Sequence, residues 1–186
     1  MGYTHYYNVP IGTHEQDKWD TFIEDCKTLY KRMPNVVGQG DRKAPLMLSG
    51  CFKYKEPVFN STKVYFNGAR SLHRVKKTAP HGDTFWEDGR TEDDMDLSHE
   101  TFVITRVSTP NTYSKEEQSS FNFCKTAGKP YDLMVTACLL LYKFYFPKVE
   151  LSSDGTAEDW KTAVTFIGNV FPERERTVSI FRNQLG

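Results

Sequence analysis

The sequence predicts an α+β fold in which three helices cover a mixed, mainly antiparallel sheet. Three segments carry apolar residues at the spacing of amphipathic helices, and several shorter segments have the alternation or β-branched content of strands. These elements do not alternate regularly, as they would in a doubly wound parallel fold. Because 186 residues suit one domain, we expect a single domain over residues 1–186 with a charged loop insertion at residues 68–98.

The N-terminal part begins with a predicted strand followed by a helix. Residues 3–9 are rich in aromatic and β-favouring side chains and end at a Pro-Ile-Gly turn. Residues 13–16 read T-x-x-Q, the pattern of a capping box, and predict that a helix begins there. Apolar side chains then recur at helical spacing until Pro34: Trp19, Phe22, Ile23, Cys26, Tyr30 and Met33.

The middle of the chain is predicted to supply strands. Glycines and prolines between residues 35 and 60 leave room only for brief ones, whereas residues 62–67 (TKVYFN) predict a longer strand. Residues 100–107 (ETFVITRV) show the clearest alternation in the chain, with Phe102 and Ile104 pointing to the same face.

Residues 68–98, between the last two of these strands, form the predicted insertion. Loops this long are uncommon in compact domains and are often functional. Two interpretations of this insertion stay open. It is either a solvated loop whose basic and acidic parts neutralise each other, or a loop that binds a partner. A metal site on Asp93, Asp94 and Asp96 is disfavoured, because the spacing of a calcium loop is missing. The basic part carries Arg70, Arg74, Lys76 and Lys77, and the acidic part carries Asp83, Glu87, Asp88 and Glu92 as well as the three aspartates.

The C-terminal part alternates short strands with two further helices. Residues 121–124 predict a short strand, and Pro130 suits the first turn of a helix that continues as the apolar run 133–146. Residues 149–151 predict a brief strand, followed by a Ser-Ser-Asp-Gly turn. Residues 156–159 have the pattern of a capped start for a third helix, and residues 177–182 predict an edge strand.

Charge and composition exclude several classes of protein. The chain carries 24 Lys and Arg against 24 Asp and Glu, and this neutrality disfavours a dedicated nucleic-acid binder. A hydrophobic content of 38% is too high for a disordered chain. The longest apolar run, residues 133–142, is shorter than the roughly 20 residues that span a bilayer. The first residues lack the features of a signal peptide, so we expect a cytoplasmic protein without a membrane partner.

The four cysteines support a reducing compartment. Cys26, Cys51, Cys124 and Cys138 contain no C-x-x-C pair, which disfavours zinc-ribbon and thioredoxin-like sites. The chain also lacks a phosphate-binding P-loop, a dinucleotide fingerprint, a zinc-protease helix and a nucleophile elbow. We therefore expect no cofactor and no metal, and the catalytic residues are not identified. Three polar clusters at the ends of predicted elements remain as candidate sites.

The first cluster, Ser98-His99-Glu100, leads into the strand that ends at Arg106. A His–Glu pair can act as an acid and a base. Neighbouring strand residues point to opposite faces, however, so His99 and Glu100 do not obviously converge. Two interpretations of this cluster therefore stay open, a surface turn and an acid–base pair.

The second cluster runs from Phe123 to Asp132 and places Lys125, Lys129 and Tyr131 between a strand and a helix N-terminus. Free backbone N–H groups, the positive helix end and two ammonium groups make an anion pocket physically reasonable. A plain basic loop at the helix entry is the alternative. A further hypothesis makes Cys124 a nucleophile, with His99 as its base.

The third cluster is the turn Ser152-Ser153-Asp154-Gly155. If it lies beside the second cluster, its hydroxyl groups can line the same pocket. Aromatic groups of the first strand can add stacking or hydrogen bonds there, although sheet packing is their commoner role: Tyr3, His5, Tyr6 and Tyr7.

Together these segments resemble a family of small uncharacterised proteins from bacteriophages and bacteria. The resemblance is carried by MGYTHYY, HETFVITR, FNFCKTAGKPYD and ELSSDGTAEDW, in this order. An arginine commonly occupies the place of Gly128 in that pattern, which weakens an anion pocket here. The resemblance implies a phage or prophage setting, hence a host bacterial cytoplasm, and it supplies no catalytic residue.

The expected function is that of a phage-type binding protein with a polar pocket for a small anionic ligand, such as a nucleotide, used to counter host defence. The first alternative is an interaction or virion-associated protein that docks through the insertion. The second is a small enzyme that uses Cys124 or the pair His99 and Glu100. A homo-oligomer is compatible with each. The expected ligand-binding residues are His99, Arg106, Lys125, Lys129, Tyr131, Ser152, Ser153 and Asp154.

Overall fold

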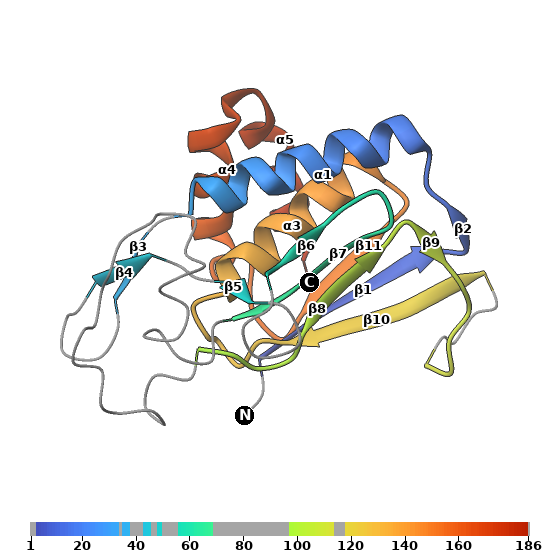
Figure 1. Cartoon of the computed structure of the whole chain (residues 1–186), viewed down its shortest axis with the longest axis horizontal. Coiled ribbons are helices and arrows are strands. Elements are labelled where there is room, and N and C mark those ends of the chain that lie inside the picture. The colour runs from blue at the N-terminus through green and yellow to red at the C-terminus, as the bar shows by residue number, and fades with distance from the viewer. Residues whose placement is uncertain are drawn as a thin grey trace.

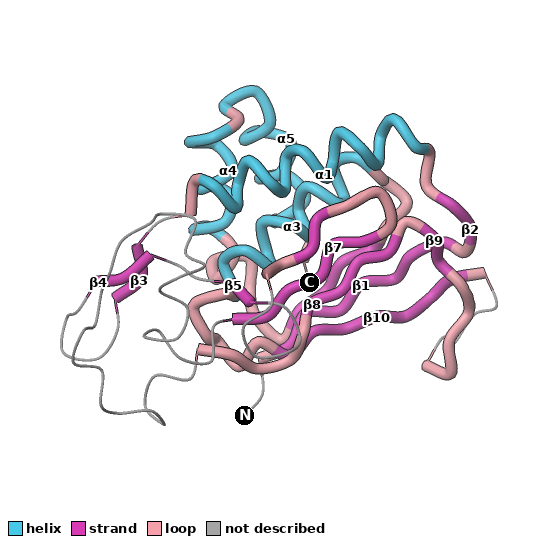
Figure 2. Tube along the Cα trace, viewed as in Figure 1, coloured by secondary structure: helices cyan, strands magenta, loops and turns pink. Residues whose placement is uncertain are grey.

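Helices form one layer of this computed structural model, and most of the strands form the layer beneath them (Figure 1). The structure describes residues 3–33, 35–37, 43–45, 48–49, 56–68, 97–113 and 118–185. Figure 2 shows the same separation by colour, with the helices in cyan and the strands in magenta. The predicted α+β class is therefore confirmed. The helices are α1 (Gln16–Lys31), α3 (Asp132–Tyr145), α4 (Lys161–Val170) and α5 (Glu175–Asn183), with a 3-10 turn, η2 (Pro172–Arg174), before α5.

The strand nearest the N-terminus lies in the middle of a three-stranded sheet. β1 (Thr4–Pro10) pairs on one side with β10 (Ser119–Lys125) and on the other with β11 (Glu150–Ser153). A second sheet is built on β7 (Lys63–Gly68). Its partners are β5 (Leu48–Ser49), β6 (Val58–Phe59) and β8 (Phe102–Thr105).

Two small pairs complete the described strands. β2 (Gly12–Thr13) pairs with β9 (Val107–Ser108), and β3 (Asn35–Val37) pairs with β4 (Lys43–Pro45). All of the pairings between described strands are antiparallel. Most of the predicted insertion, residues 69–96, lies outside the described residues.

The core lies between the helix layer and the inner face of the sheet. In β1, the inward side chains His5, Tyr7 and Val9 are buried, and the residues between them are partly exposed. Helix α3 is buried on several sides, as its apolar run predicted, and residues 134–142 are all buried. Burial of a large apolar side chain contributes roughly 1.5–3 kcal/mol, so α3 dominates the packing.

Two local predictions are wrong, each for a physical reason. Thr13 does not cap α1, because it lies in β2 opposite Val107, and the helix begins at Gln16 without a side-chain cap. Residues 177–182 form part of α5 rather than an edge strand. Their β-branched content suggested a strand, but Val178 is buried and Phe181 packs beside it, a spacing of three that fits one helix face.

Candidate functional site

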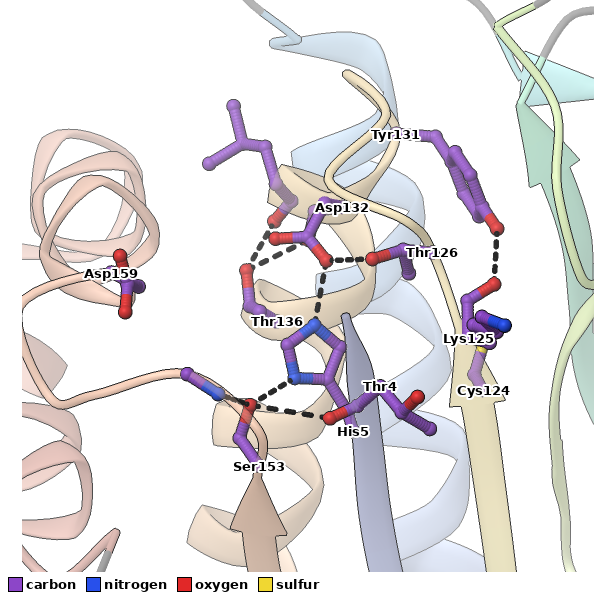
Figure 3. Close-up of polar contacts among 12 residues, drawn as sticks. Thr4, His5, Cys124, Lys125, Thr126, Tyr131, Asp132, Thr136, Ser153 and Asp159 are labelled. Carbon is purple, nitrogen blue, oxygen red and sulfur yellow. Dashed lines mark hydrogen bonds and ion pairs between the residues drawn. The ribbon is translucent and has the colours of Figure 1, made fainter. Parts of the chain in front are cut away.

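The strand register brings a buried histidine next to a serine. His5 lies directly opposite Ser153 of β11 and opposite Cys124 of β10. Its side chain points inward, is fully buried and reaches the first residue of α3, Asp132 (Figure 3). We call Asp132, His5 and Ser153 the His5 centre.

The imidazole ring of His5 connects the other two side chains. Its Nε2 lies 2.6 Å from Oδ1 of Asp132, and its Nδ1 lies 2.9 Å from Oγ of Ser153. A carboxylate only accepts hydrogen bonds, so Nε2 carries the proton and donates it to Asp132. In the neutral ring Nδ1 is then an acceptor for the single hydroxyl proton of Ser153, and it lies closer to Oγ than the alternative acceptor, the carbonyl of Thr4 at 3.4 Å. This arrangement has the connections of a nucleophile, a base and an orienting carboxylate.

Further contacts hold Asp132 in position. The hydroxyl of Thr126 donates to the same Oδ1 that accepts from His5. Thr136, one turn along α3, donates to the backbone carbonyl of Asp132 at 2.8 Å. The carboxylate also lies at the N-terminus of α3, where the helix dipole favours negative charge.

Ser153 is half-buried at the end of β11 and is also oriented by backbone. The N–H of Gly155 donates to its Oγ at 3.0 Å. A Cβ at position 155 would lie 2.5 Å from the ring of Tyr3, so the glycine allows this ring to approach. Burial and then the carboxylates of Asp132, Asp159 and Asp154 raise the pKa of Tyr3 to about 12, although a hydrogen bond with Ser153 lowers it.

Two aromatic rings enclose His5. Tyr3 meets it edge-on with ring centroids 4.9 Å apart, and Trp160 does so at 5.0 Å. Trp160 precedes α4 and is fully buried. Its Nε1 has no hydrogen-bond partner within the described part of the chain. A buried donor of this kind is costly unless a bound molecule accepts from it.

The third predicted cluster does meet the N-terminal strand. The carboxylate of Asp154 accepts from the N–H of Thr4 and from the hydroxyl of Tyr6, both at 3.0 Å. Ser152 lies opposite Tyr6 on the outer face of the sheet and is exposed, whereas Ser153 points toward His5. Ser153 and Asp154 therefore both contact residues of β1.

The second cluster lies across β1 from the third. Lys125 is opposite Thr4, and its backbone N–H donates to Oε2 of Glu100 at 2.7 Å. Tyr131 is fully buried, and its hydroxyl donates to the carbonyl of Glu100 at 2.7 Å. Lys129 is half-buried in the loop between β10 and α3. The second cluster is thus hydrogen-bonded to Glu100, which belongs to the first cluster and leads into β8.

The loop amides of the second cluster are used within the protein. The N–H groups of Thr126 and Ala127 both donate to the carbonyl of Tyr3, at 3.0 and 3.1 Å. Ala127 and Gly128 have left-handed backbones, with φ of 53° and 66°. Two such residues in succession bend the loop tightly around Tyr3.

The remaining predicted residues do not join the His5 centre. The N–H of His99 donates to Asn67, and the Glu100 carboxylate contacts Lys125 rather than His99. Arg106 lies beyond the opposite end of β1, where its Nε donates to the carbonyl of His14 at 3.2 Å. Seven strand residues separate the two ends, a length of about 20 Å.

The properties of Cys124 argue against its use as a nucleophile. The side chain is fully buried, and burial, followed by the charge of Glu100, raises the pKa of its thiol to about 12. The reactive form of a cysteine is the thiolate, which is scarce at neutral pH in such surroundings.

Sequence reasoning did not identify His5 as a base, Asp132 as its partner or Trp160 as a neighbour.

Among the described residues, no three metal-ligating side chains are grouped for a metal, and no helix has the length and apolarity to cross a bilayer. Comparisons with protein-family models, with curated proteins and with solved structures return no match.

Proposed function

We propose that the chain is a hydrolase of the acyl-transfer class, in which Ser153 is the nucleophile and His5 is the general base. Asp132 orients His5 and stabilises its protonated form. The observation that carries the proposal is the continuous chain of hydrogen bonds from Asp132 through His5 to Ser153, at 2.6 and 2.9 Å. Both distances lie within the range of direct proton transfer between a base and a nucleophile.

The reaction follows from the proton positions. The Oγ of Ser153 attacks the carbonyl carbon of an ester, and its proton moves to Nδ1 of His5. The Nε2–H of His5 stays hydrogen-bonded to the charged Asp132 throughout. Nδ1 then gives its proton to the leaving alcohol as the acyl bond breaks. Water, deprotonated by the same nitrogen, releases the acid and restores Ser153.

Two features of the surroundings support a substrate that is not anionic. Three carboxylates, those of Asp132, Asp154 and Asp159, act together on the hydroxyl of Tyr3 next to Ser153. Their field repels a negatively charged acyl group. The indole ring of Trp160 lies beside His5, and its N–H, which has no partner within the described residues, is a candidate donor to the oxygen of a neutral carbonyl.

The resemblance to bacteriophage and bacterial proteins is compatible with this site. His5, Asp132 and Ser153 come from three of the four segments that carry the resemblance, MGYTHYY, FNFCKTAGKPYD and ELSSDGTAEDW. These segments are far apart in the chain, and β1 and its neighbours bring them together.

The test is covalent labelling with a fluorophosphonate probe, together with hydrolysis of a neutral p-nitrophenyl ester. We expect the probe to modify the wild-type chain and the Ser152→Ala variant, and to leave Ser153→Ala unmodified. Ser152 is the matched control because it is the adjacent serine and faces away from His5. His5→Gln is expected to lower the labelling rate by 100-fold or more, on the order of the loss of a general base.

Labelling that persists in Ser153→Ala, or a wild-type chain that reacts with neither reagent, would contradict the proposal. Circular dichroism of each variant establishes that the fold is intact. A peptide map of the labelled protein identifies the modified residue directly.

Capture of a small anionic ligand, the function expected from the sequence, is the second candidate. It rests on the ammonium groups of Lys125 and Lys129 on either side of the loop, because the N–H groups of Thr126 and Ala127 already donate to the carbonyl of Tyr3. Native mass spectrometry of protein from phage-challenged and unchallenged cells tests it. A bound mass of a few hundred daltons, lost in the Lys125→Ala/Lys129→Ala double variant, supports capture, and bare protein in both samples contradicts it.

A further inference from the structure

A cleft between β8 and β10 forms a second site, separate from the His5 centre. At one end the segment that leads into β8 is joined to β10, because the N–H of Glu100 donates to the carbonyl of Lys125 at 3.2 Å. Beyond this contact no pairing links β8 to β10, and a cavity of about 350 Å³ opens between them. Its size is at the lower end of the range for small-molecule sites, roughly 300–1,000 Å³.

The lining of this cleft carries no charged side chain among the residues that the structure describes there. Charged residues make up 26% of the chain, so their absence here distinguishes the cleft from the rest of the surface. Hydroxyl, amide and aromatic groups take their place. A charged ligand would lose its hydration and find no opposite charge in return, so the lining favours an uncharged one.

Ser108 supplies an unsatisfied hydrogen-bonding group. Its side chain lines the cleft and is only 6% exposed. Its Oγ has no hydrogen-bond partner within the described part of the chain. A buried hydroxyl that stays unpaired is unfavourable, and a ligand in the cleft that donates to Oγ or accepts from it removes the penalty.

Two exposed aromatic rings border the same cleft. Tyr113 is 65% exposed and Phe123 is 42% exposed, and the rings meet edge-on with centroids 5.9 Å apart. Exposed rings at a cavity mouth provide a flat apolar surface for stacking.

The backbone of β10 adds directed hydrogen-bonding groups. The N–H and carbonyl of Lys125 bond toward Glu100 and therefore point away from β1. Backbone groups of alternate strand residues point the same way, so Phe123 presents its N–H and carbonyl to the cleft. The neighbouring edge of β8 is partly used, because the hydroxyl of Tyr7 donates to the carbonyl of Val103.

We propose that this cleft binds an uncharged ring that has a flat or apolar face and carries hydrogen-bond donors and acceptors on its edge. The ring stacks on the face of Phe123 and contacts Tyr113, which stands nearly perpendicular to it, and its polar edge pairs with Ser108 and with the backbone of Phe123. A nucleoside base and a monosaccharide share this chemistry. The site does not involve Ser153, which lies on the far side of β1, so its occupancy is independent of hydrolysis at the His5 centre.

The test is a binding titration by isothermal calorimetry and by ligand-detected NMR. The probes are adenosine, uridine, glucose and galactose, with adenosine monophosphate as the charged comparison. We expect at least one neutral probe to bind with a millimolar or lower Kd, and adenosine monophosphate to bind no more tightly than adenosine. Comparison of the two nucleosides with the two sugars shows whether the cleft prefers a nucleoside base or a monosaccharide.

Three variants establish where the probe binds. Ser108→Ala is expected to weaken binding roughly 5-fold to 20-fold, the effect of one buried hydrogen bond, and Phe123→Ser to weaken it similarly by removing the ring. Ile180→Ala, an exposed apolar residue on α5, is the control and should bind as the wild type does. Failure of every neutral probe to bind, tighter binding of adenosine monophosphate than of adenosine, or wild-type affinity in both Ser108→Ala and Phe123→Ser would overturn the proposal.

Discussion

Asp25 in α1 and Arg174 in η2 form an ion pair between residues 149 positions apart in the chain. Their side chains are only 10% and 16% exposed. The hydroxyl of Tyr145 in α3 donates to the same carboxylate, and the guanidinium of Arg174 lies 4.2 Å from the ring centroid of Phe171. This contact joins α1, α3 and the start of the C-terminal helix.

Loss of this carboxylate should destabilise the protein strongly. In Asp25→Ala the largely buried guanidinium of Arg174 keeps only the exposed carboxylate of Glu173, 3.3 Å from its Nε, and the hydroxyl of Tyr145 loses its acceptor. We expect the free energy of unfolding to fall by about 3–5 kcal/mol in urea titrations. Lys27→Ala, which breaks an exposed pair with Glu24, is the control and should leave the free energy of unfolding nearly unchanged. Equal losses in the two variants would contradict this prediction.

The stability should depend on pH through His14. Burial, and then the charge of Arg106, lower the pKa of its ring from 6.5 to about 4. The unfolded chain therefore binds the proton first as the pH falls, and the stability that is present above pH 6.5 is lost between pH 6.5 and 4. Because the ring is partly exposed and water screens part of the effect, we expect a loss of about 1–2 kcal/mol.

The check on His14 is a comparison of unfolding curves for the wild type and His14→Gln at several pH values. Glutamine does not titrate and can keep a hydrogen bond to Tyr142, which contacts Nε2 of His14 at 2.6 Å. The difference in stability between the two proteins should change across the window from pH 6.5 to 4. A constant difference would show that His14 does not titrate there.

The described cysteines should be inert in the native state. Cys26, Cys124 and Cys138 are buried, and burial raises the pKa of Cys26 well above its usual range. In a Cys51→Ser variant, which removes the thiol that lies outside the described residues, we expect no reaction with Ellman's reagent until denaturant unfolds the chain. A thiol that reacts within seconds in native buffer would be at odds with this burial.

A side chain at position 155 should disturb the His5 centre through Tyr3. In Gly155→Ala the new Cβ would meet the Tyr3 ring at 2.5 Å, so the ring must move away from His5 and Ser153. We expect slower labelling of Ser153 by the fluorophosphonate probe, with a free energy of unfolding reduced by about 1–3 kcal/mol. Glu158→Ala, which removes an exposed carboxylate paired with Lys161 on the surface, should leave labelling largely unchanged.

The sequence predicted those elements whose pattern is local. The helix expected at residues 133–146 is α3, Asp132–Tyr145, because its apolar run and its flanking prolines mark both ends. The strand predicted at residues 100–107 is broken at Arg106 into β8 and β9, because the N–H of Arg106 pairs with Thr62 while β9 turns to pair with β2.

The His5 centre could not be predicted in the same way, because it depends on strand order. Alternation along β1 places His5 on the inner face, and that much can be derived from the sequence. The choice of β11 as a neighbour, and the register that sets His5 opposite Ser153, join residues 148 positions apart. No local pattern encodes such a pairing.

The central position of β1 has a consequence for synthesis. During synthesis β1 has no neighbour in its sheet until residues 119–125 and 150–153 have been made. The nascent chain must therefore hold this aromatic segment unpaired until both neighbouring strands have been made. A high contact order of this kind slows folding and exposes the segment to aggregation. We expect co-translational chaperones to bind residues 3–9. Stalled nascent chains that end before residue 150 should lack the native three-stranded sheet.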